Sequence, residues 1–190
     1  MKVDIRRLDP EEDDHLLEEA FGWLMASPSW RKQTEVVFGT LDWDCYQIAA
    51  HDPGRVDIGI WTDDKFTAIV ILTIRAKGVY EVHFEAAPGT SPEAIIAAGR
   101  LIRDQLFGRY HAAMVYTWTP KWNKGVLAID KAIGFRPTNV TMLHGTCRGR
   151  LIEWVNLELR ADYGWQEADS DTKHDSKPEP DERLRLDDAA

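Results

Sequence analysis

Three titratable side chains occupy every second position in residues 79–87. Glu81, His83 and Glu85 share one face of the strand that this segment predicts, because successive strand side chains point to opposite faces. A carboxylate near an imidazole is suited to general acid–base chemistry. Burying three such groups in a core would be costly, which favours a cleft beside this face. A solvated face at a sheet edge is an equally good explanation of the pattern.

Another carboxylate of interest, Asp130, lies in a predicted helix over residues 122–133. An aspartate can donate a proton near neutral pH only where it is desolvated, and the sequence favours the alternative of a solvated helix residue. Asn123 stands at the start of this helix, where an N-cap is its ordinary role. Gly134 follows the last apolar residue and predicts a C-cap.

The elements that must position these residues alternate between strand and helix periodicity. Asp9 and Ser91 are N-cap candidates, and each is followed by a proline at the first helical position. Strands are predicted over 3–8, 56–61, 66–75, 79–87, 112–119, 140–144 and 151–159, and helices over 10–26, 29–41, 92–108 and 122–133. Short turns separate the second, third and fourth strands, which predicts an antiparallel meander.

The order strand, helix, strand over residues 79–119 predicts a crossover and therefore one parallel pair. Such a junction splays two strands apart and leaves a cleft between them. The predicted fold class is α+β with α/β/α-like layers: a mixed, mostly antiparallel sheet with a central β-α-β crossover and helices on both faces.

The segment from Asn123 to Phe135 carries a family resemblance. An asparagine just after a strand, a short amphipathic helix and then Gly134-Phe135 is similar to the pattern of the GNAT superfamily of acetyl-CoA-dependent N-acetyltransferases. Residues 79–84 resemble the fourth strand of that family with its acidic residue. The resemblance covers roughly residues 3–160 and implies a donor bound between the strand ending at Ala87 and the strand ending at Thr119.

The resemblance implies an acyltransferase that moves an acetyl group from acetyl-CoA to an amine acceptor by direct attack. It implies Glu81 as the base, directly or through a water, with His83 as the reserve, and places Asp130 where the family often has a tyrosine acid. Deprotonating a lysine-like amine at pH 7 costs roughly 4.6 kcal/mol, whereas the thiol leaving group needs only about 2 kcal/mol of help. A base therefore matters more than an acid.

The cofactor-binding residues that the resemblance implies lie on the strand, in the following loop and beside the second helix. They are Phe84, Ala86, Gly89, Thr90, Ser91, Glu93, Ala94, Asn123 and Lys124. Free amides at a helix N-terminus can hold a pyrophosphate, and Asn123 would bind the pantetheine arm unless it is only an N-cap. The loop departs from the family pattern because it is short, has one glycine and includes Pro92, which lacks an N–H.

This departure leaves a second hypothesis, a catalytically degenerate GNAT-fold protein with a binding or structural role. The acceptor is also open among a polyamine, an aminoglycoside-like amine, a protein N-terminus and a lysine side chain. Acidic residues at the cleft favour a cationic acceptor. A homodimer is one of the assemblies left open.

The charge distribution separates the chain into two regions. Residues 161–190 hold ten acidic and four basic residues, a net charge of −6, so residues 1–160 carry only −3 of the total −9. We expect one GNAT-like domain over 1–160 and a disordered acidic tail over 161–190, which has too little apolar surface to fold.

The composition argues against several classes of protein. A negative chain is unsuited to nucleic acid, and no apolar stretch approaches the roughly 20 residues of a membrane span. The sequence has no metal-ligand spacing and no apolar leader, so Cys45 and Cys147 are expected to be reduced cytoplasmic thiols. These features predict a cytoplasmic protein that binds no metal, and the resemblance implies acetyl-CoA as the acyl donor.

Overall fold

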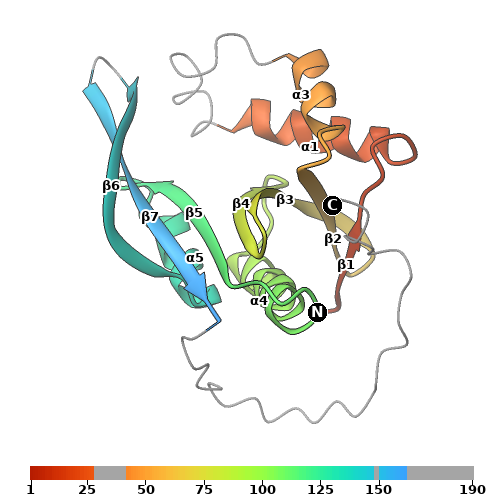
Figure 1. Ribbon diagram of the computed structural model, residues 1–190. Helices are drawn as coiled ribbons and strands as arrows, with labels where there is room; N and C mark the ends of the chain where they lie inside the picture. The colour runs from red at the N-terminus through yellow and green to blue at the C-terminus, as the bar shows by residue number, and fades with distance from the viewer. Residues whose placement is uncertain (28–41, 148–149, 162–190) are drawn as a thin grey trace.

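The computed structural model describes residues 1–27, 42–147 and 150–161, which form one mixed sheet with helices on both faces (Figure 1). The strands are β1 (Val3–Arg7), β2 (Arg55–Thr62), β3 (Lys65–Ala76), β4 (Val79–Ala86), β5 (Met114–Pro120), β6 (Arg136–Cys147) and β7 (Arg150–Arg160). The helices are α1 (Asp14–Ala26), α3 (Trp43–Ala50), α4 (Pro92–Gly108) and α5 (Lys124–Ile133). The predicted fold class is confirmed.

The strand order is β1-β2-β3-β4-β5-β7-β6. The meander β2-β3-β4 is antiparallel, as expected, and the pair β4-β5 is the parallel pair that the crossover through α4 requires. The last strand, β7, lies between β5 and β6 and pairs antiparallel with both, a position that the sequence pattern did not predict.

The two helices after the meander begin where their capping residues predict, and α5 also ends at its predicted glycine. The Ser91 side chain accepts a hydrogen bond from the Ala94 amide at the start of α4, and Pro92 occupies the first turn. The Asn123 side chain accepts one from the Val126 amide at the start of α5. Gly134 ends α5 with φ of 119°, a conformation that favours glycine.

The predicted start of the first helix was wrong. Asp9 does not cap α1; its carboxylate accepts the Glu11 amide in a local turn, and the helix begins at Asp14. Asp13 occupies the N-cap position instead, and its carboxylate accepts the Asp9 amide at 3.0 Å and pairs with Arg6 at 2.8 Å.

The N-terminal half also contains a helix that was not predicted from the sequence. The helix α3 begins where the Asp42 carboxylate accepts the Cys45 amide at 2.9 Å. The helix predicted over 29–41 lies outside the described residues, and so does the tail beyond residue 161.

Apolar side chains fill both sides of the sheet. One core packs α4 and α5 against the sheet around Leu72, Ala98 and Leu157, and the other packs α1 and α3 around Leu17 and Ile69. Figure 1 shows α1 and α3 together on one side of the sheet and α4 and α5 on the other. Consecutive residues of β4 therefore face different helix pairs.

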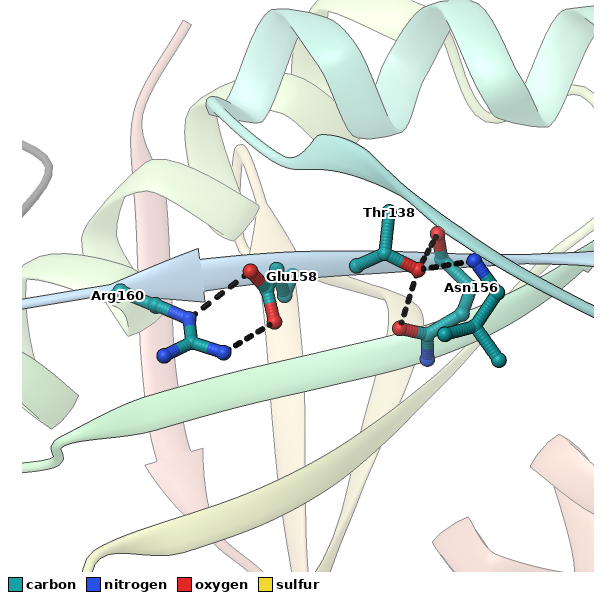
Figure 2. A network of polar contacts seen from close by, with 5 residues as sticks. Thr138, Asn156, Glu158 and Arg160 are labelled. Atoms are coloured by element: carbon teal, nitrogen blue, oxygen red, sulfur yellow. Dashed lines mark hydrogen bonds and ion pairs between the residues drawn. The ribbon is translucent and has the colours of Figure 1, made fainter.

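A polar network supports the far end of the sheet (Figure 2). The ladder between β6 and β7 is irregular after Pro137, and the Thr138 hydroxyl compensates by donating to the Asn156 carboxamide oxygen at 3.1 Å. Asn156 in turn donates to the Thr117 carbonyl of β5 at 3.4 Å. Because Thr117 lines the cavity described next, this network holds one wall of the candidate site.

Candidate active site

The strands β4 and β5 are paired only at one end. Their parallel register covers Val79–Glu81 against Met114–Tyr116, although β4 continues to Ala86 and β5 to Pro120. A cavity of about 360 Å³ lies beside the unpaired portion, within the usual range for a small-molecule site. The cleft expected at the crossover is therefore present.

The cavity reaches both faces of the sheet. Phe84 and Glu85 point to opposite sides of β4, yet both line it, so the space extends through the gap between the strands. Its wall on the α4 and α5 side is largely apolar and includes Ile102 and Ile129, while Ser27 at the end of α1 contributes on the opposite side. Two ligands approaching from opposite faces would meet in this gap.

Glu81 lies at the closed end of the gap, in the last paired position of β4. Its carboxylate contacts His83 at 3.5 Å and the Arg75 Nε at 2.6 Å, and the Tyr116 hydroxyl donates to it at 3.4 Å. The hydrogen bond to His83 and the guanidinium of Arg75 lower the pKa of Glu81 to about 2. Neither Glu81 nor His83 belongs to the described lining of the cavity.

Glu85 lies in the cavity wall, on the face of β4 that is packed against α1 and α3. Burial raises the pKa of its carboxyl to about 7. Across the strand ladder its neighbour is the fully buried Ile69 of β3. Glu85 is therefore the carboxyl of the predicted trio that is both poised near neutral pH and open to the cavity.

Asp130 is buried in the wall of the same cavity, so the interpretation of a solvated helix residue was wrong. The Thr119 hydroxyl of β5 donates to its Oδ2 at 2.8 Å. Desolvation raises the pKa of Asp130 to about 6, against the opposing effect of that hydrogen bond. Asp130 is therefore desolvated, as an aspartate must be to donate a proton near neutral pH, and it lies on the α5 side of the gap.

The loop between β4 and α4 has fewer free amides than expected. Gly89 adopts φ of 88°, which favours glycine, and turns the chain so that the Thr90 amide donates to the Ala87 carbonyl at 3.1 Å. The Ala94 amide is used by the Ser91 cap. Among the described residues, no hydrogen bond engages the amides of Gly89, Ser91 and Glu93, and these remain for an anion.

The other predicted cofactor-binding residues divide into two groups. Phe84, Ala86 and Asn123 line the cavity, whereas Lys124 is exposed at the start of α5 and is not among the described lining residues. Asn123 is an N-cap, as its ordinary role predicted, and its side-chain oxygen is used for that purpose. Its amide group can still donate toward the cavity.

Two residues of the cavity wall, Glu85 and Thr119, were not predicted as site residues. Glu85 was recognised only as part of the titratable face, and Thr119 only as the end of a strand. The alternation of β4 assigns Glu85 to a face, but its access to the cavity depends on where the β4-β5 pairing stops. Three-dimensional packing also determines the burial of Asp130, which no local sequence signal indicates.

The described residues contain no cluster of three or more His, Cys, Asp or Glu side chains arranged to hold a metal ion. None of the helices described is long and apolar enough to cross a bilayer.

Solved N-acetyltransferase structures share this fold. Spermidine N-acetyltransferase from Vibrio cholerae in complex with CoA and spermine matches with a TM-score of 0.63 and 12% identity, over 84% of this chain and 95% of that one. YncA, a putative acetyltransferase from Salmonella typhimurium with its cofactor acetyl-CoA, gives 0.60 and 15% over 85% and 95%. A dodecameric structure of the Vibrio enzyme gives 0.60 and 13% over 88% and 98%.

At these identities the likeness establishes the fold, which is that of the GNAT N-acetyltransferases. Neither a family model nor a curated protein matches the sequence.

Proposed function

We propose that this chain, which has the GNAT fold, transfers an acetyl group from acetyl-CoA to an amine acceptor. The observation that carries the proposal is the cavity that passes through the gap between β4 and β5. A donor entering on the α4 and α5 side and an acceptor entering on the α1 and α3 side meet there, which direct attack requires. A solved structure with this fold contains both CoA and spermine.

The donor is assigned to the apolar side of the cavity. Phe84, Ala86 and Asn123 would contact the pantetheine arm, with the Asn123 amide group as a donor to its carbonyls. The amides of Gly89, Ser91 and Glu93 would face the pyrophosphate at the N-terminus of α4. Thr90 and Ala94 shape this loop through their internal hydrogen bonds.

Asp130 is proposed to support the leaving thiolate. A carboxyl with a pKa of about 6 is protonated in roughly a tenth of the molecules at pH 7, and this fraction can donate a proton to the leaving sulfur. The thiol needs only modest help, so the expected contribution is about 2 kcal/mol or less. Glu81, with its pKa of about 2, is ionised throughout the working range and positions Arg75 and His83.

The competing proposal is a GNAT-fold binding protein without turnover. The loop before α4 favours it, because Pro92 lacks an amide hydrogen and the Thr90 and Ala94 amides are already bonded. Under this proposal the chain would retain the cavity but hold the cofactor weakly or not at all.

Addition of acetyl-CoA to the purified protein is expected to raise its melting temperature by several degrees at millimolar concentration, through mass action. Differential scanning fluorimetry with desulfo-CoA and adenosine as controls measures the shift. Thiol release on addition of spermine, the ligand in one structural relative, then tests turnover. Absence of stabilisation by acetyl-CoA would overturn the transferase proposal.

A homodimer is the proposed assembly. The edge strand β6 and its partner β7 expose the apolar side chains of Val140, Leu143 and Leu151 at 54%, 64% and 61%, at a sheet edge that a second copy would cover. Leu143→Glu is expected to convert a dimeric mass to a monomeric one in size-exclusion chromatography with light scattering. Ile48→Glu, at an exposed position on α3, is the matched control and should leave the mass unchanged.

A further inference from the structure

Glu85 occupies the point of the molecule where the two sides of the cavity meet. Its neighbours Phe84 and Ala86 also line the cavity, because this end of β4 has no partner strand on the β5 side. The side chain itself points toward α1 and α3, the side assigned to the acceptor. A carboxylate here faces the incoming amine rather than the pantetheine arm.

The surroundings of Glu85 leave its carboxylate free to exchange a proton. Within the described residues it has no ion pair and no hydrogen bond, and Ser27 is the polar neighbour in the cavity wall that α1 supplies. On its own strand the nearest titratable group on that face is His83, which contacts Glu81. The neighbour from β3 is the apolar Ile69.

The helix α3 contributes the phenol of Tyr46 near Glu85. Burial raises the pKa of Tyr46 to about 12, so it stays neutral and adds no charge. Arg55 of β2 stacks on the Tyr46 ring, and its charge is matched by Asp57, whose oxygens lie 3.0 and 3.1 Å from the guanidinium Nε. The charges closest to the Tyr46 ring thus cancel each other. Burial is therefore the main cause of the raised pKa of Glu85.

We propose that Glu85, rather than Glu81, is the general base that removes a proton from the acceptor ammonium. The inference rests on the proposed acetyl transfer. Glu85 takes one proton from the ammonium and later releases it to water. The nitrogen lone pair then forms the C–N bond to the thioester carbonyl carbon, the C–S bond breaks, and the second proton of the nitrogen passes to the departing thiolate.

The two glutamates differ greatly in basicity. A lysine-like ammonium has a pKa near 10.4, so proton transfer to a carboxylate of pKa about 7 is unfavourable by roughly three orders of magnitude. Transfer to Glu81, with a pKa of about 2, is unfavourable by roughly eight. A base that must work near neutral pH is therefore far better served by Glu85.

The test compares Glu85→Gln with Glu81→Gln on two small acceptors, methylamine and hydroxylamine, by acetyl-CoA-dependent thiol release. Methylamine is protonated at pH 7 and needs a base, whereas hydroxylamine is already neutral. Glu85→Gln is expected to lower kcat/KM for methylamine by at least about 100-fold and for hydroxylamine by less than about fivefold. In Glu81→Gln, kcat/KM for methylamine should still rise with pH through a pKa near 7, as in the wild type.

Two further readouts separate the possible failures. NMR of glutamate side chains labelled with carbon-13 should show a carboxyl titrating near pH 7 that disappears in Glu85→Gln, and acetyl-CoA affinity should be unchanged in this variant. Equal slowing of both acceptors, or a pH profile retained in Glu85→Gln, overturns the assignment to Glu85 alone. Acetyl-CoA binding without thiol release from methylamine, hydroxylamine or spermine overturns the proposed function, and this inference with it.

Discussion

Replacing Asp130 by asparagine is expected to stabilise the protein at neutral pH and to leave its stability unchanged in acid. The folded-state pKa of about 6 exceeds the ordinary value of 3.8, so the folded state binds more protons than the unfolded state between these values. Stability is then lost as pH rises from about 4 to 6, by up to about 3 kcal/mol. Asparagine retains the acceptor for Thr119 and removes the buried charge.

Urea unfolding of the wild type and of Asp130→Asn at pH values from 3.5 to 8 measures this difference. Glu19→Gln on the exposed face of α1 is the control, with an expected change within about 0.5 kcal/mol at every pH. A variant that loses stability as pH rises, relative to wild type, would show that the Asp130 anion is stabilised by the fold, contrary to the effect of burial. The Asp130→Asn variant should also transfer the acetyl group more slowly than the wild type, by about 30-fold or less.

Filling the cavity from α5 is expected to weaken donor binding strongly while leaving the fold intact. Val126 lines the cavity, yet its side chain is 39% exposed, so a larger group can be placed there without repacking a core. Val126→Trp should weaken acetyl-CoA binding by at least about 100-fold, or about 2.7 kcal/mol, because the indole takes space that the pantetheine arm would occupy.

Isothermal titration calorimetry with acetyl-CoA measures that loss, and the melting temperature without ligand checks the fold. Ala128→Trp is the matched control, since Ala128 is exposed on the same helix and is not among the described lining residues. Both variants should melt within a few degrees of the wild type. Undiminished affinity in Val126→Trp would mean that the donor binds away from this cavity.

Local signals were sufficient to predict the meander, α4 and α5. Each has a start or stop that depends on nearby residues, such as the Ser91 cap or Gly134, and local hydrogen bonds are visible in the sequence. The start of α1 was wrong because Asp13 interacts with Arg6 of the preceding strand, a contact that Asp9 and Pro10 do not reveal.

The candidate site could be predicted only as far as strand alternation extends. The sequence assigned Glu81, His83 and Glu85 to one face, and the alternate β4 residues Val82, Phe84 and Ala86 do pack against the core on the opposite face. Their different environments follow from long-range contacts: Arg75 and Tyr116 surround Glu81, while the end of the β4-β5 pairing exposes Glu85 to the cavity. Desolvation of Asp130 likewise depends on β5.

The position of β7 between β5 and β6 has a consequence for biosynthesis. As the chain leaves the ribosome, β5 can pair with β4 over only three residues, and its other edge stays open until residues 150–160 emerge. The wall of the cavity that β5 forms therefore cannot be completed during synthesis of the first 149 residues. A nascent chain arrested before β7 should remain accessible to protease and chaperones, and release of the last strand should close the domain in one cooperative step.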